Sequence, residues 1–147
     1  MLLKERLIKD LKEAMKSRNQ VWKNVITLIR SDINQIEIDK RIKLQEKDII
    51  DIISRQMKQR KDALEEFEKA EREDLIKQTK EEIQYLLEYL PEQLSKEELS
   101  HIVRETIAEI GANSMKDMGK VMAATLPKIK GRADGKTVNQ IVRQQLQ

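Results

Sequence analysis

Leu90-Pro-Glu-Gln-Leu-Ser-Lys-Glu-Glu98 ends one predicted helix and begins another. Pro91 cannot donate a helical hydrogen bond and pushes Leu90 out of the helical region, so the preceding helix stops here. Ser95 and Glu98 have the spacing of a capping box, in which each side chain accepts a hydrogen bond from the other residue's backbone amide. The segment therefore predicts a boundary between two helical modules, residues 1–90 and 91–147.

Apolar residues before this boundary recur every three or four positions, which is the spacing of one helix face. No window of six residues alternates convincingly between apolar and polar side chains, so no strand is expected. The sequence predicts an all-α fold whose first module is a hairpin or bundle of four longer helices. Their stripes begin at Leu3, Trp22, Ile49 and Leu75.

The residues after the boundary predict a small module of three shorter helices. Gly111 fits the C-terminal end of the first helix, and Asp134 can cap the last one. Gly131 fits a left-handed end of a helical stretch, and Gly135 is tolerated in the first turn that follows. Gly119 interrupts a helical pattern, which predicts close approach of another helix.

Composition excludes several classes of protein. The chain has no cysteine and one histidine, His101, so a thiol nucleophile, a disulfide or a histidine-rich metal site is impossible. No apolar run approaches the roughly 20 residues that span a bilayer. The basic, amphipathic N-terminus contains the acids Glu5, Asp10 and Glu13, which argue against a transit peptide. A cytoplasmic protein without membrane contact, cofactor or metal is expected, and the oligomeric state stays open.

Positive charge gathers near the C-terminus. Residues 112–147 contain seven basic and two acidic side chains, whereas residues 1–111 contain 22 basic and 24 acidic ones. Lysines beside glycine turns and a helix N-terminus suit contacts with backbone phosphates. A solvated surface is the alternative, and no aromatic residue lies there to stack on a base. The candidate RNA-binding residues are Lys120, Lys128, Lys130, Arg132 and Lys136.

Two kinds of catalytic site receive little support from the sequence. Gly131-Arg-Ala-Asp-Gly-Lys-Thr137 contains Gly-Lys-Thr, but its glycine spacing is one residue too short for a phosphate loop and no strand precedes it. His101 lacks a paired acid and nucleophile nearby, so an ordinary surface histidine is expected. No catalytic residue is predicted.

Three segments of the chain resemble the GatB/YqeY family, and in particular its stand-alone members. They are Tyr89-Leu-Pro-Glu-Gln-Leu-Ser-Lys-Glu-Glu-Leu99, Asp117-Met-Gly-Lys-Val-Met122 and Lys130-Gly-Arg-Ala-Asp-Gly-Lys136. Lys58-Gln-Arg60 and Glu68-Lys-Ala-Glu-Arg72 also resemble the stand-alone members, so the likeness covers essentially the whole chain.

The resemblance implies that the second module is similar to the C-terminal tail of the B subunit of tRNA-dependent amidotransferase, which contacts the tRNA body. The matching positions are Gly119, Lys120, Gly131, Arg132, Asp134, Gly135 and Lys136. The family is also associated with carbon–nitrogen ligase activity that uses glutamine as amide donor. This chain lacks the catalytic part of that subunit, so a non-catalytic module associated with tRNA or other RNA is expected. The alternatives are an accessory factor of a glutamine-dependent amidotransferase, or of translation, and a protein-interaction module without RNA.

Overall fold

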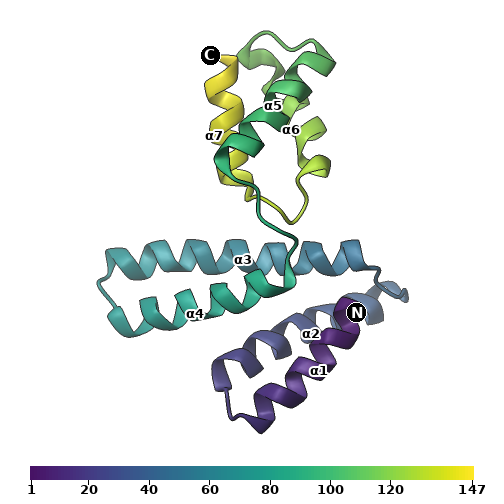
Figure 1. Ribbon diagram of the computed structural model, residues 1–147, viewed down its shortest axis with the longest axis vertical. Helices are drawn as coiled ribbons and strands as arrows, with labels where there is room; N and C mark the ends of the chain where they lie inside the picture. The colour runs from purple at the N-terminus through teal and green to yellow at the C-terminus, as the bar shows by residue number, and fades with distance from the viewer. The chain divides into compact units, whose positions relative to one another are not determined.

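The protein is all-α, as the sequence predicts. A computed structural model describes all 147 residues (Figure 1). It contains no strand and no helix with the length and apolar character needed to cross a membrane. The α-helices are α1 (Leu3–Lys16), α2 (Gln20–Lys40), α3 (Glu46–Lys69), α4 (Glu73–Tyr89), α5 (Lys96–Ile110), α6 (Met118–Thr125) and α7 (Gly135–Leu146), with the short 3-10 helices η1 (Met115–Asp117) and η2 (Leu126–Lys128).

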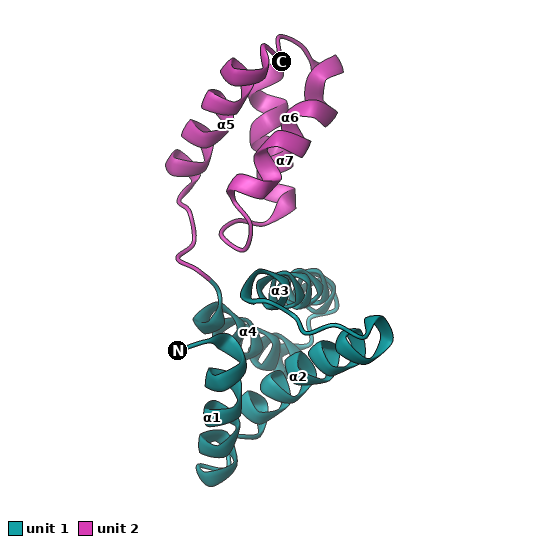
Figure 2. Ribbon diagram, turned by 90° about the vertical axis from the view of Figure 1, so that its right-hand side faces the viewer, with its two compact units in different colours: residues 1–90 teal, residues 91–147 magenta.

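The chain divides into two compact units, Met1–Leu90 and Pro91–Gln147, called unit 1 and unit 2 below (Figure 2). Each unit has a hydrophobic core of its own. The core of unit 1 is drawn from α1 to α4, and that of unit 2 from α5, α6, α7 and the residue Ile129. Neither core borrows a buried residue from the other unit.

Unit 1 consists of two helical hairpins, α1 with α2 and α3 with α4 (Figure 1). Each hairpin turns at a non-glycine residue in the left-handed region, Arg18 at φ 58° and Glu71 at φ 54°. Asn19 then starts α2, because its side chain accepts a hydrogen bond from the backbone amide of Trp22 at 3.1 Å. The apolar stripes of the helices meet in the middle, where Leu7, Ile26 and other aliphatic side chains are fully buried.

Three of the four aromatic residues gather where α1, α2 and α4 meet. The rings of Trp22 and Tyr85 are stacked with centroids 5.7 Å apart. Trp22 Nε1 donates to the Tyr89 hydroxyl at 3.0 Å, and that hydroxyl donates to Asp10 Oδ2 at 2.7 Å. Arg6 lies over the Tyr89 ring at 4.7 Å. This network attaches the first hairpin to α4 by directional bonds as well as by apolar contact.

Unit 2 begins with the predicted capping box. The amide of Glu98 donates to Ser95 Oγ at 3.1 Å, and the amide of Ser95 donates to Glu98 Oε1 at 3.2 Å. Helix α5 ends at Gly111, which adopts the left-handed conformation with φ 67°. Both ends of α5 are therefore set by residues within the helix's own sequence neighbourhood.

Candidate nucleic-acid interface

The residues from Lys128 to Lys136, called the basic loop below, run from the last residue of η2 into the first turn of α7. Ile129 is 1 % exposed and anchors this loop in the core of unit 2. Gly131 takes the left-handed conformation with φ 75°, and the amide of Arg132 donates to the Ile129 carbonyl at 2.8 Å. The buried isoleucine and the glycine turn fix the backbone, so the charged side chains project from a defined support.

A segment far away in sequence holds the other side of the basic loop. The amide of Leu94 donates to the Arg132 carbonyl at 2.8 Å, and Gln93 Nε2 donates to the Gly131 carbonyl at 2.7 Å. Arg132 Nε donates in return to the Glu92 carbonyl at 3.1 Å. Two of the segments that carry the family resemblance, at 89–99 and 130–136, are thus hydrogen-bonded to each other.

Asp134 starts α7 as predicted. Its Oδ1 accepts a hydrogen bond from the amide of Thr137 at 2.7 Å. Gly135 is the first residue of the helix, and a Cβ at this position would meet no atom within 4 Å. The Asp134 carboxylate therefore occupies the helix N-terminus that an anionic ligand would otherwise approach.

The structure separates the five predicted cations into groups. Lys130 and Lys136 lie on the basic loop with exposed side chains, and Arg132 between them is half-buried. Lys128 is engaged within unit 2, where its Nζ donates to Thr106 Oγ1 at 2.9 Å and to Glu109 Oε2 at 2.8 Å. An RNA phosphate would have to compete with Glu109 for Lys128.

Lys120 stands apart from the basic loop. It is exposed in the first turn of α6, whereas the basic loop begins after the end of that helix. Its neighbour Gly119 is also exposed, and a Cβ built there would have open space around it. The prediction that Gly119 allows close approach of another helix was wrong, because no helix packs against that position.

The acidic residues of α5 reduce the positive charge that the sequence places near the C-terminus. Unit 2 as a whole has nine basic and seven acidic side chains. Hydrogen bonds from the backbone and hydroxyl of Ser95 lower the pKa of Glu98, and the charge of Arg132 adds to this effect. Glu98 therefore stays ionised and offsets part of the charge of Arg132.

The other candidate groups carry no catalytic geometry. His101 is an exposed residue, as expected, but it does have an acidic neighbour, since its Nε2 lies 3.0 Å from the exposed Glu105 Oε1 one turn along α5. No group of three or more acidic or histidine side chains has the arrangement of a metal site. Gly131-Arg-Ala-Asp-Gly-Lys-Thr137 follows a 3-10 helix, whereas a phosphate loop follows a strand.

Comparison with known proteins relates the chain to two kinds of named relative. It is 39% identical over 88 residues to "Altered inheritance of mitochondria protein 41, mitochondrial" of Candida glabrata, a match of 58% of this chain and 48% of the relative. The protein of the same name in Pyrenophora tritici-repentis is 28% identical over 130 residues, covering 87% of this chain and 71% of that protein. A 49-residue segment, 33% of this chain, is 43% identical to 8% of a Glutamyl-tRNA(Gln) amidotransferase subunit of Thermococcus sibiricus.

The expectation of a cytoplasmic protein is contradicted by these comparisons. Several of the curated relatives are named mitochondrial proteins, which points to mitochondria rather than the cytoplasm. Receptors recognise the targeting signals of proteins. The absence of a membrane-spanning segment and the presence of a few acidic residues near the N-terminus therefore do not decide the compartment.

The family assignment rests on nearly the whole chain. Residues 4–146 match the family of YqeY-like proteins, so the match includes both units and the basic loop. The chain spans about half the length of the Candida glabrata relative, so that protein has a further part to which this chain shows no match. The chain belongs to the family of YqeY-like proteins.

Proposed function

We propose that unit 2 is a non-catalytic module that binds the phosphate backbone of structured RNA, with tRNA as the foremost candidate. The observation that carries this proposal is the basic loop, which presents the cationic side chains of Lys130, Arg132 and Lys136 on a backbone fixed at both edges. A fixed backbone reduces the conformational entropy lost when the side chains meet phosphates. The segment shared with an amidotransferase subunit whose name includes tRNA gives independent support.

The composition of unit 2 favours backbone contact over base recognition. All four aromatic residues of the chain, Trp22, Phe67, Tyr85 and Tyr89, belong to unit 1. Single-stranded RNA is usually bound by stacking bases on aromatic rings, and unit 2 offers no such ring. The proposed ligand is therefore a folded RNA, in which the phosphates lie at fixed spacing.

A salt titration tests the proposal. Filter binding of unfractionated tRNA to the full chain is measured over a series of salt concentrations. Each phosphate contact removed reduces the slope of log affinity against log salt by about one. We expect this reduction for Lys130→Ala and for Lys136→Ala, whose residues are exposed on the basic loop.

Lys116→Ala is the matched control. Lys116 is exposed on η1, which precedes α6 and lies outside the basic loop. Its removal lowers the net charge of unit 2 by the same amount and should leave the slope unchanged. No detectable tRNA binding at low salt, or an equal loss for Lys116→Ala, would sink the proposal.

A second candidate function is an accessory role in glutamine-dependent amide transfer to tRNA, which the similarity to the Thermococcus sibiricus amidotransferase favours. Under this hypothesis the chain binds the amidotransferase or its tRNA substrate and does no chemistry itself. The pure protein is added to a reconstituted amidotransferase reaction. An unchanged rate and an unchanged tRNA affinity would count against this role.

A further inference from the structure

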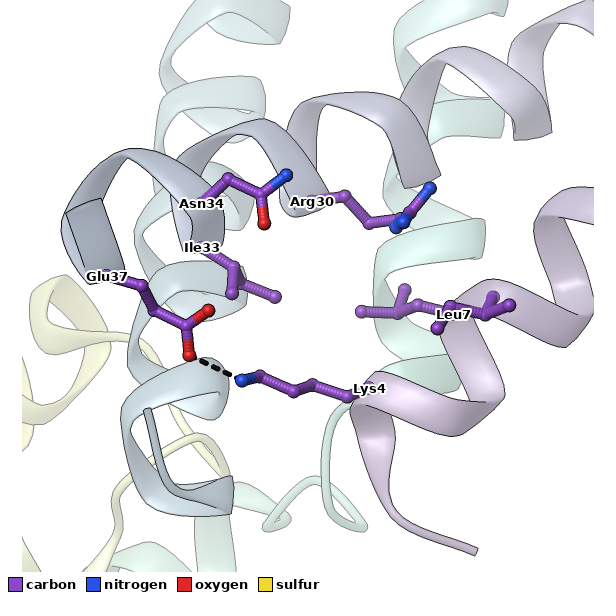
Figure 3. A pocket seen from close by; sticks show the side chains of 7 residues that line it. Lys4, Leu7, Arg30, Ile33, Asn34 and Glu37 are labelled. Atoms are coloured by element: carbon purple, nitrogen blue, oxygen red, sulfur yellow. Dashed lines mark hydrogen bonds and ion pairs between the residues drawn. The ribbon is translucent and has the colours of Figure 1, made fainter. Parts of the chain in front are cut away.

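Unit 1 has an open groove between α1 and α2 that the RNA-binding proposal does not use. A cavity of about 140 Å³ lies in this groove. Its floor is apolar, since Leu7 is fully buried and Ile33 is 4 % exposed. Figure 3 shows polar side chains around this floor, from α1 on one side and α2 on the other. The lining residues are Lys4, Leu7, Ile8, Arg30, Ile33, Asn34 and Glu37.

Besides Lys4, helix α1 lines the groove with Ile8, which begins an apolar strip along that helix. Ile8 is 45% exposed and Met15 is 57% exposed, although both are large hydrophobic residues. They are seven residues apart, which places them on the same flank of the helix two turns from each other. Leu11 lies between them and is half-buried. Helix α1 thus presents an apolar strip that starts at the groove with Ile8 and is partly exposed.

Helix α2 contributes one cation without an ion pair to the groove, Arg30, beside Asn34 and Glu37. Lys23 lies seven residues before Arg30 on the same flank, beyond the residues that line the cavity, and neither side chain forms an ion pair or a hydrogen bond. The acid that lines the groove, Glu37, is already engaged: the hydrogen bond from Lys4 Nζ and a second one from the Leu44 amide lower the pKa of its carboxyl group. Lys4 and Glu37 neutralise each other, so the free charge along the groove is positive.

We infer that this groove binds an acidic amphipathic helix of a partner protein. An apolar strip beside unpaired cations is complementary to a helix with apolar side chains at positions i, i+4 and i+7 and with Asp or Glu on the adjacent flank. One aliphatic side chain of the partner fills the cavity over Leu7 and Ile33, and a carboxylate meets the guanidinium of Arg30.

The shape of the groove favours a protein over an anionic membrane. A lipid surface needs a convex apolar face, but the most apolar positions of α1, including Leu3, Leu7 and Ala14, are buried in the core of unit 1. A concave floor instead accepts a protruding side chain.

The test uses the full chain and a fluorescein-labelled synthetic helical peptide of about 15 residues with leucine at i, i+4 and i+7 and glutamate on one flank. A second peptide carries lysine in place of each glutamate. Fluorescence anisotropy gives the dissociation constants. We expect saturable binding of the acidic peptide and at least tenfold weaker binding of the basic one.

Two pairs of variants locate the binding site. Arg30→Glu should weaken binding of the acidic peptide about tenfold, while Arg55→Glu, at an exposed and unpaired position on α3, should not. Ile8→Ala should weaken it several-fold, while Leu28→Ala, which is 48% exposed on the opposite flank of α2, should not. Circular dichroism confirms that each variant is folded.

Several outcomes would overturn the inference. Failure of the acidic peptide to bind does so, as does an equal loss for Arg30→Glu and Arg55→Glu, which would reveal only an effect of net charge. Preferential binding of phosphatidylserine-containing vesicles that depends on Arg30 would assign the groove to a membrane instead. A dimer that is detected by analytical ultracentrifugation and abolished by Arg30→Glu would assign it to a second copy of the chain.

Discussion

Tyr89 connects three helices of unit 1 through one hydroxyl group. This residue is 3 % exposed, and its hydroxyl accepts from Trp22 and donates to Asp10. Because a buried polar group that loses its partner retains the cost of leaving water, each end of this chain of hydrogen bonds depends on Tyr89. Only a few atoms form this network. Removal of the Tyr89 hydroxyl oxygen should therefore weaken the packing of the α1–α2 hairpin on α4.

Tyr89→Phe should lower the free energy of unfolding by about 1–3 kcal/mol, since it leaves the Trp22 indole N–H and the Asp10 carboxylate without this partner. Burial, followed by the hydrogen bond to Asp10, raises the pKa of Tyr89. In the unfolded chain the phenol ionises near its ordinary pKa of about 10, so the native state favours the protonated form.

The contribution of Tyr89 is therefore fully present below about pH 10 and falls as pH rises above that value. Denaturant unfolding of wild type and Tyr89→Phe at several pH values measures both effects. The difference in stability should shrink between about pH 10 and pH 11. A difference that stays constant over this range would contradict the assignment.

Two exposed glycines of unit 2 have different backbone conformations. Gly111 ends α5 with φ 67°, whereas Gly119 lies within α6 in a helical conformation. A Cβ would meet no atom within 4 Å at either position. The two sites therefore differ in backbone conformation and not in available space.

Alanine should have opposite effects at these two positions. Gly111→Ala should destabilise unit 2 by about 1–2 kcal/mol, because an L side chain is strained in the left-handed region. Gly119→Ala should stabilise it by up to about 1 kcal/mol, since alanine loses less conformational entropy in a helix. Thermal unfolding followed by circular dichroism compares the two variants with wild type. A loss of stability for Gly119→Ala would show that a side chain is not tolerated there.

At the scale of the whole molecule, each unit contains the residues that its own core requires. Residues 1–90 supply every buried side chain of the first core, and residues 91–147 supply every buried side chain of the second. Unit 2 is small, and domains of roughly 60 residues bury a limited share of their surface and are only marginally stable. The two units are thus expected to unfold at different temperatures.

A fragment of residues 1–90 should fold alone. Trp22 is the only tryptophan and belongs to the aromatic cluster of unit 1, so its fluorescence reports that unit both in the fragment and in the full chain. We expect the midpoint of this signal to differ by less than about 5 °C between the two proteins. An unfolded fragment, or a markedly lower midpoint, would show that unit 1 depends on unit 2.

Features that depend on neighbours within about four residues could be predicted from the amino-acid sequence alone. The apolar stripes indicate the all-α class, and the caps at Ser95 and Asp134 and the stop at Gly111 follow from side chains and backbone preferences that act within one helical turn. The five candidate cations could be named from their clustering in the sequence, but the ion pair between Lys128 and Glu109 could not.

Contacts between residues that are distant in sequence could be known only from the folded protein. Folding pairs Lys128 with Glu109, joins the Glu92–Leu94 segment to Gly131 and Arg132, and leaves Gly119 exposed where close packing was expected. It also creates the groove between α1 and α2, whose walls come from two helices. Charge pairing and cavities depend on which surfaces the packed helices bring together, and this information is not contained in the periodicity of any single segment.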